Sequence, residues 1–221
     1  MNPSPTHAPQ RTSPVNVDEP ITVEPYNPVW AAQFARERDI LCQALSVEPP
    51  QVEHIGSTSI IGMHAKPIVD IMLGLDGFPA SPAVSVRLRS VGYEALGEAG
   101  VPGRLYFRKR QPTAFNVHAV SFGGPHWNDN LLLRDFLSAH PAEARRYAEE
   151  KQHAFNAGHR TLLAYSAVKA SITTALLAAA HQCTKSPNQA LQRTAPAVTL
   201  AAPPPSSSHP SHQPPPSRSL G

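Results

Sequence analysis

The segment 67–75, PIVDIMLGL, restricts the possible folds of this chain more than any other feature of its sequence. It is a nearly continuous apolar run that contains a single carboxylate, Asp70. Such a run is typical of a strand that lies inside a sheet and is covered on both faces. We therefore expect an α/β fold, in which helices pack on a sheet.

The segments around this run predict further strands and several helices. Apolar residues at helical spacing indicate a helix over 27–45, and 51–55 and 93–96 are expected to be short strands. Apolar and polar residues alternate in 104–110 and 114–120, which predicts an antiparallel hairpin. The remaining helices are expected at 82–92, 128–140, 141–157 and 160–180. This order predicts a mixed sheet followed by a helical C-terminal half.

The distribution of proline predicts the limits of the folded domain. Of the 25 prolines, 14 lie in residues 1–20 and 182–221. These ends contain too few large apolar residues to form a core, so we expect a disordered N-terminal arm over 1–20 and a disordered tail over 181–221. The part between them, 21–180, has the size of one domain. The Pro-rich tail could alternatively bind an aromatic-lined groove.

The sequence also argues against several classes of protein. It has no uninterrupted run of 18 apolar residues, so no membrane-spanning segment is expected. The start, MNPSPTHAPQ, lacks the apolar stretch of a secretory signal. The two cysteines, Cys42 and Cys183, are expected to be free thiols in a reducing compartment. We therefore expect a cytoplasmic protein.

The net charge of +3 does not indicate a nucleic-acid-binding protein. Residues 21–181 carry 15 basic and 14 acidic residues, and the tail adds three basic residues and no acidic one. A domain that binds the phosphate backbone normally has a denser basic stripe, so nucleic acid is an unlikely partner. The sequence also lacks a P-loop, a GxGxxG motif, an HExxH motif and a GxSxG motif.

The segment 52–73 contains the candidate site. Gly56 ends a predicted strand, and three hydroxyl residues follow it. Hydroxyls and free backbone N–H groups after a glycine can bind a phosphate group, which makes candidates of Gly56, Ser57, Thr58 and Ser59. Asp70 is costly inside an apolar strand unless it is paired or binds a metal. Asp70 could therefore belong to the site, or it could pair with Lys66, Arg104 or Arg108 and only hold the sheet together.

Other residues allow more than one interpretation. Arg104 and Arg108 share one face of a predicted strand, where they could bind phosphate or form a solvated surface. Lys151 and Lys169 could reach a phosphate, although solvated lysines are commoner. Imidazole and carboxylate groups could also form a transition-metal site from His54, His64, Asp70 and His118, and the alternative for His54 is a hydrogen-bonded histidine at a strand end.

The motifs HIGSTSxxGxxAKPIVDI, RLYFRK, NVHAV and LLLRDFLSAHP, with Trp127, Tyr147 and Lys151, resemble the GrpB family over roughly 21–179. That family is placed in the nucleotidyltransferase superfamily and is also found fused to dephospho-CoA kinase. The resemblance implies a nucleotidyltransferase-like fold. It also implies that Ser57 holds a nucleotide phosphate and that Asp70 binds Mg²⁺.

The chain departs from the superfamily pattern at its carboxylates. The second carboxylate position is Met72, whose thioether is a poor ligand for Mg²⁺. On the strand expected to supply the third, alternation places Asn116 and His118 on one face, so that His118 would meet Asp70. One aspartate cannot align a two-metal transfer, although His118 and Glu53 could complete a one-metal site. Ile61 also stands where the family typically has proline.

Three hypotheses follow. The first is a Mg²⁺-dependent nucleotidyltransferase with an unknown acceptor, in which Asp70 and His118 are catalytic and Lys66, Arg104 and Arg108 neutralise charge. The second is a module that binds a nucleotide or related phosphorylated small molecule without turnover. The third is an interaction protein that works through its Pro-rich tail.

Overall fold

The structure, a computed structural model, describes residues 18–185. One five-stranded mixed sheet, with strand order β1-β2-β5-β4-β3, forms its centre. β2 and β5 are parallel, and the other neighbouring strands are antiparallel. The strands are β1 Val52–Ile55, β2 Val69–Leu75, β3 Glu94–Ala95, β4 Leu105–Lys109 and β5 Phe115–Ser121. The expected mixed sheet, buried central strand β2 and β4–β5 hairpin are all confirmed.

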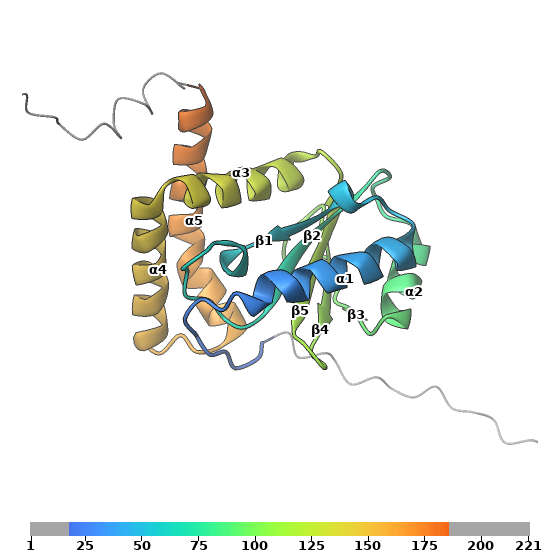
Figure 1. Ribbon diagram of the computed structural model, residues 1–221, viewed down its shortest axis with the longest axis horizontal. Coiled ribbons are helices and arrows are strands. Elements are labelled where there is room, and N and C mark those ends of the chain that lie inside the picture. The colour runs from blue at the N-terminus through green and yellow to red at the C-terminus, as the bar shows by residue number, and fades with distance from the viewer. Residues whose placement is uncertain (1–17, 186–221) are drawn as a thin grey trace, which may run out of the picture. The chain divides into compact units, whose positions relative to one another are not determined.

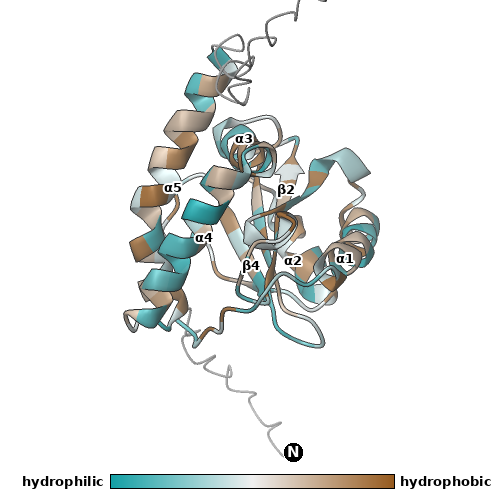
Figure 2. Cartoon of the chain, turned by 60° about the vertical axis from the view of Figure 1, so that its left-hand side comes forward, coloured by the Kyte–Doolittle hydropathy of each residue, from teal (hydrophilic) through white to brown (hydrophobic). Residues whose placement is uncertain are grey.

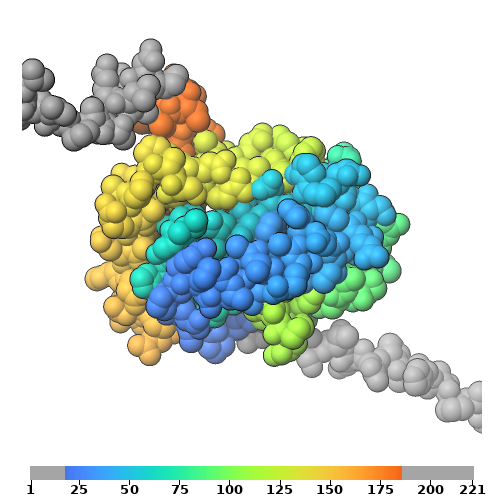
Figure 3. All heavy atoms as spheres, viewed as in Figure 1, coloured from blue at the N-terminus to red at the C-terminus, as the bar shows by residue number. Residues whose placement is uncertain are grey.

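Helices cover both faces of this sheet. The helices are α1 Val29–Leu45, α2 Pro82–Ser90, α3 Pro125–Ala139, α4 Pro141–Asn156 and α5 Leu162–Lys185. Helix α1 lies across one face together with α2, and α3, α4 and α5 form the helical C-terminal half (Figures 1 and 3). Two short 3₁₀ turns, η1 Pro49–Gln51 and η2 Ser57–Ser59, flank β1.

Alternation along β2 gives the two faces of the sheet different roles. Ile71 and Leu73 are fully buried in the apolar core between the sheet and α1 and α2. Because successive side chains point to opposite faces, Asp70 and Met72 belong to the other face. There Met72 packs with Trp127 of α3 in a small apolar cluster, and Asp70 lies beyond that cluster on β2. The single carboxylate of the central strand therefore faces the helical C-terminal half.

The folded part extends past both expected limits. Helix α5 ends at Lys185 rather than at 180, and α3 begins at Pro125 rather than at 128. Residues 18–20, which were expected to belong to the arm, also make ordered contacts: the Glu19 carbonyl accepts a hydrogen bond from the Leu162 N–H at 2.8 Å, and its carboxylate pairs with Arg110. The remaining predictions for the two ends lie outside the described residues.

Helix α5 bears on the expectation that no segment spans a membrane. Among the described helices, it is long and apolar enough to cross a membrane by length and composition alone. Helix α5 packs against α3 and α4, but only 17% of its apolar window is buried, so most of that surface is exposed. Figure 2 shows the contrast between the largely hydrophobic α5 and the hydrophilic α4 beside it.

Candidate functional site

Asp70 is held by four nitrogen–oxygen contacts on the face of the sheet that meets the C-terminal helices. Lys66 Nζ lies 3.2 Å and 3.4 Å from its two carboxylate oxygens. Its Oδ1 atom also accepts from Asn116 Nδ2 at 2.7 Å and from His118 Nε2 at 3.4 Å. Burial alone would raise the pKa of Asp70, but Lys66, His118 and Asn116 together hold it well below its usual range. Asp70 is therefore ionised.

Gly56 approaches Asp70 so closely that no other residue fits. A Cβ atom added to Gly56 would lie 2.9 Å from Asp70 Oδ2, closer than real Cβ contacts. The backbone of Gly56 also has φ +71° and ψ −170°, a conformation that is open essentially only to glycine. Glycine at this strand end therefore allows the η2 turn to pass directly over the Asp70 carboxylate.

The three hydroxyls of η2 have different environments. Ser57 Oγ accepts a hydrogen bond from Lys151 Nζ at 2.8 Å. Thr58 is buried and pairs with His54 Nε2 at 3.0 Å, while Ser59 Oγ donates to the Gly56 carbonyl at 2.6 Å. Only Ser57 therefore connects the turn to the group of cations described next.

Three cations and a further lysine lie near this one carboxylate. Lys66, Lys169 and Arg104 line a single cavity together with Asp70, whereas Lys151 is bonded to Ser57 of the neighbouring turn and is not a lining residue. Lys151 is only 2% exposed, which corrects the expectation of a solvated lysine. Burial, together with the charges of Lys169 and Lys66, lowers the pKa of Lys151 to about 6.

Tyr147 separates the two helix-borne lysines. Lys151 Nζ lies 4.7 Å and Lys169 Nζ 6.0 Å from the centre of its ring. The neighbouring Tyr147 is the main cause of a raised pKa at Lys169, and Asp70 adds to the shift. Lys169 therefore keeps its charge, whereas Lys151 gives up its proton readily.

Hydrogen bonds define the protonation state of His118. Arg104 Nη1 lies 3.3 Å from His118 Nδ1, and an arginine can only donate. Nδ1 must therefore be the acceptor, and Nε2–H donates to Asp70. Burial lowers the pKa of His118, which agrees with this neutral ring. Alternation along β5 predicted that His118 would meet Asp70, and the register pairs Met72 with His118 and Asp70 with Asn116.

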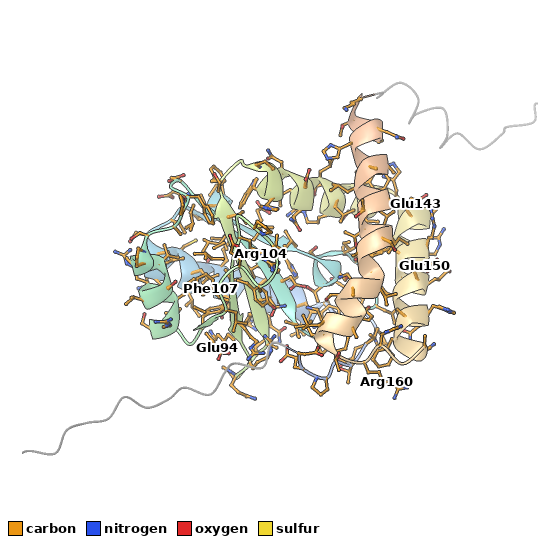
Figure 4. The ribbon with its side chains drawn as sticks, turned by 180° about the vertical axis from the view of Figure 1, so that it is seen from behind. Glu94, Arg104, Phe107, Glu143, Glu150 and Arg160 are labelled. Carbon is orange, nitrogen blue, oxygen red and sulfur yellow. The ribbon has the colours of Figure 1, made fainter. Side chains whose placement is uncertain are left out.

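The cavity has a volume of about 320 Å³ and lies between the sheet, α5 and the loop before β4. Figure 4 shows the molecule with α5 in front. In this view Arg104 lies over the sheet, while Glu143 and Glu150 lie on α4, away from Arg104. The side chains that line the cavity and carry charge or hydrogen-bonding groups are Lys66, Asp70, Arg104, Tyr106, Asn116, His118, Asn130, Ser166 and Lys169. The Nε atom of Arg104 is buried and has no hydrogen-bond partner among the described residues.

A second hollow, of about 560 Å³, lies on the far side of the η2 turn and does not include Asp70. It is formed by the loop after η2 and by the corner between α3 and α4. Ile60, Ile61, Met63 and Leu137 give it a mainly apolar lining. Its charged lining residues are Arg145 and Glu149, one of each sign, whereas the first cavity has an excess of positive charge; the candidate site is therefore the cavity at Asp70.

Several candidate residues lie elsewhere. Arg108 is on the same face as Arg104 but pairs with Glu94 at 2.9 Å and with Glu19 at 3.8 Å. Glu53 does not reach Asp70, because it forms an ion pair with Arg134 of α3 at 2.6 Å.

The proposed transition-metal group does not form. The ring of His54 stacks on Phe34 of α1, on the opposite face of the sheet from Asp70. Within residues 18–185, no three His, Cys, Asp or Glu side chains lie close enough to hold a metal ion. His54 instead matches the alternative of a hydrogen-bonded histidine, since its partner is Thr58.

The donors at Asp70 do not fit Mg²⁺ either. Mg²⁺ requires oxygen ligands at close range in octahedral geometry. The Asp70 oxygens already accept from Lys66, Asn116 and His118. Apart from Asp70, the charged side chains that line the cavity are lysines and an arginine. Met72, at the second carboxylate position, is 1% exposed in an apolar cluster. A divalent ion would have to displace the Lys66 ammonium and would meet like charge.

Sequence reasoning missed the central position of Lys151 and Lys169. A signal for Lys151 was present: Tyr147, Lys151 and Ala154 follow one another at helical spacing, and all three are buried. Asn116 was placed on the correct face, but its hydrogen bond to Asp70 was not foreseen.

Comparison with known proteins places this arrangement in a family. A family model described as GrpB protein matches residues 20–179. UPF0157 protein YqkA of Bacillus subtilis is 38% identical over 128 residues, and the match spans 58% of this chain but only 37% of YqkA. UPF0157 protein PA4798 of Pseudomonas aeruginosa is 32% identical over 176 residues, which cover 77% of this chain and 72% of that protein.

A solved structure and a more distant relative extend the comparison. The crystal structure of conserved protein GrpB from Enterococcus faecalis superposes with a TM-score of 0.66 at 29% identity, covering 74% of this chain and all but 1% of that one. A protein named dephospho-CoA kinase, from Mycolicibacterium paratuberculosis, is 26% identical over 68% of this chain and 43% of its own length. The family model, the relatives and the shared fold agree, and the chain belongs to the GrpB family.

Proposed function

We propose that this protein binds a phosphorylated small molecule, such as a nucleotide, in the cavity at Asp70. The observation that carries the proposal is the excess of positive charge: Lys66, Lys169 and Arg104 share the cavity with one carboxylate. Buried like charges repel one another, and an anionic ligand would remove that cost. Phosphate groups are the anions that clustered Lys and Arg side chains commonly bind.

The contacts of the site support this proposal. Arg104 stacks over the Tyr106 ring at 5.0 Å, which positions the guanidinium at the cavity wall. The η2 turn contributes Gly56 and Ser57 beside the lysines, and the first N–H groups of a helical turn have no partner within it. The residues assigned to the ligand are therefore Gly56, Ser57, Lys66, Arg104 and Lys169, while the buried Lys151 holds Ser57 in position.

The relatives favour the same class of ligand. The distant relative named dephospho-CoA kinase and the resemblance to nucleotidyltransferases both indicate nucleotide-related chemistry. We propose binding rather than transfer, because the second carboxylate position is the buried Met72 and Glu53 pairs with Arg134. This is the second of the hypotheses drawn from the sequence.

Calorimetric titration with AMP and with adenosine tests the proposal. AMP is expected to bind, and adenosine to bind at least about tenfold more weakly, because a charge-assisted hydrogen bond contributes about 1.5–3 kcal/mol. Lys169→Met is expected to weaken AMP binding about tenfold. Lys185→Met, an exposed lysine at the end of the same helix, is the matched control and should leave the affinity unchanged. Equal affinity for AMP and adenosine would contradict the proposal.

A further inference from the structure

We infer that Lys66 occupies the place of a divalent cation at Asp70, so that the cavity receives a small phosphomonoester free of Mg²⁺. This inference rests on the proposed function, but it adds a statement about the ligand and the cofactor. The resemblance to nucleotidyltransferases implies a metal at this carboxylate, whereas the residues present provide their own positive charge.

The Lys66 ammonium group lies where a metal ion would contact Asp70. Lys66 Nζ contacts both oxygens of Asp70, at 3.2 Å and 3.4 Å, as a cation shared between them would. The side chains of Lys66 and Asp70 are 11% and 18% exposed, so water screens this pair little. The turn before β2 holds Lys66 in place, since its carbonyl accepts from the Ile68 N–H at 2.8 Å.

The charges around the Lys66–Asp70 pair disfavour a divalent ion. Lys169 and Arg104 line the same cavity, so a divalent ion would meet three cations and one carboxylate. Asn116 and His118 also donate to Asp70 Oδ1. A metal could reach Asp70 only by displacing these donors, and Asp70 is the only carboxylate among the described residues that line the cavity.

Lys66 retains a hydrogen-bond donor for a ligand. A lysine ammonium has three N–H donors, and the two contacts with Asp70 leave a third. Because Lys66 lines the cavity, that donor is available to a phosphate oxygen. Asp70 then keeps Lys66 charged and in position, and Lys66, Lys169 and Arg104 neutralise the phosphate.

The ligand class follows from charge and size. A phosphomonoester carries about two negative charges near neutral pH, which three cations and one carboxylate balance. The cavity volume of about 320 Å³ is at the small end of the range for ligand pockets. Nucleoside triphosphates normally arrive with Mg²⁺ bound to their phosphates, which this cavity would repel. A nucleoside monophosphate or a phosphorylated metabolite of similar size matches both properties.

The decisive experiment is calorimetric titration of the full chain with AMP in EDTA and in excess Mg²⁺. The inference predicts dissociation constants within about twofold of each other. It also predicts that ATP binds more weakly in Mg²⁺ than in EDTA. Binding of AMP or ATP only when Mg²⁺ is present would overturn the inference and leave the proposed function standing. Failure of AMP to bind in both buffers would overturn the proposed function.

A second measurement uses the metal alone and needs no ligand. The electron paramagnetic resonance signal of Mn²⁺ reports the free ion, and the inference predicts the same signal with the wild type as with Asp70→Asn. Loss of signal with the wild type that Asp70→Asn restores would overturn the inference, whatever the ligand titrations show. In EDTA, Lys66→Arg should retain AMP binding to within about fivefold, whereas Lys66→Met should lose at least tenfold. Equal affinity of Lys66→Met and the wild type would contradict the role given to Lys66.

Discussion

Lys151 Nζ lies 2.8 Å from Ser57 Oγ, although 94 positions separate the two residues in the sequence. The same ammonium also donates to the His64 carbonyl at 2.8 Å. Lys151 thus connects α4 to two separate points of the segment between β1 and β2. The helical C-terminal half is therefore part of the candidate site, which the sheet alone does not complete.

This contact predicts an unusual dependence of stability on pH. The pKa of Lys151 falls to about 6 in the folded chain, from 10.5 for an ordinary lysine. Between these values the unfolded state binds one more proton, so the free energy of unfolding rises with pH by at most about 1.4 kcal/mol per unit. Urea unfolding at pH 7, 8 and 9 should show this rise in the wild type and not in Lys151→Met.

The control for this prediction is Lys185→Met, which removes an exposed lysine of α5. Its pH dependence should follow that of the wild type, because an exposed lysine has similar surroundings in both states. Parallel curves for wild type and Lys151→Met would show that Lys151 stays protonated.

Gly56→Ala should disturb both stability and the site. The new methyl group would lie 2.9 Å from Asp70 Oδ2, and the backbone conformation costs a non-glycine residue about 1–3 kcal/mol. We expect a lower denaturation midpoint and at least tenfold weaker AMP binding. Gly62→Ala is the comparison, because Gly62 also has positive φ, at +80°, but a Cβ there meets nothing within 4 Å. If Gly62→Ala weakens AMP binding as much, the contact with Asp70 is not the cause.

Asp70→Asn should destabilise the fold because it leaves Lys66 buried without a counter-charge. Breaking one side of such a pair costs about 3 kcal/mol. In the double variant with Lys66→Met, the loss should be smaller than the sum of the single losses, which a double-mutant cycle measures. Additive losses would mean that the pair is not coupled.

The same pair predicts the response to acid. The pKa of Asp70 lies below the usual 3.8, so its stabilising effect is present above that value and is lost as the pH falls through the folded-state pKa. The stability difference between wild type and Asp70→Asn should therefore shrink in strong acid. A constant difference from neutral pH to acid would contradict this.

Arg104, just before β4, and Arg108, on the same face within β4, should behave differently. Arg104 lines the cavity, whereas Arg108 pairs with Glu94 and Glu19. Arg104→Gln should weaken AMP binding about tenfold, since it removes a charged donor to the ligand. It should also lower stability, because Arg104 Nη2 donates to the Glu98 and Ala99 carbonyls. Arg108→Gln should leave the affinity unchanged. A larger loss of affinity in Arg108→Gln would show that the phosphate lies further along the strand.

Local patterns predicted most of the fold and part of the site. The apolar run at 67–75 identified the buried strand β2, and the alternation in 104–120 identified the β4–β5 hairpin. Period-two alternation also placed His118 on the face of Asp70, because the side-chain direction in a strand depends only on position.

The remaining parts of the site depend on how distant elements pack. Alternation put Arg108 beside Arg104, but its partner Glu19 lies in a segment that composition assigned to the disordered arm. Helix α4 is rich in charged residues, so burial of Lys151 becomes evident only when Tyr147 is known to face inward. The ion-pair partner of a side chain and its burial depend on tertiary contacts between segments far apart in the sequence, which composition and periodicity do not record.

The most direct test of ligand binding at Asp70 is a ¹⁵N NMR titration of the full chain with AMP in EDTA. Binding in this cavity predicts saturable shifts of the backbone amides of Gly56 and Ser57, together with shifts of His118 on β5. The amide of Ile61, whose side chain is 86% exposed beside the apolar hollow, should not move. Saturable shifts confined to the loop around Ile61, or no saturable shift at all, would contradict the claim that the cavity at Asp70 binds a phosphorylated ligand.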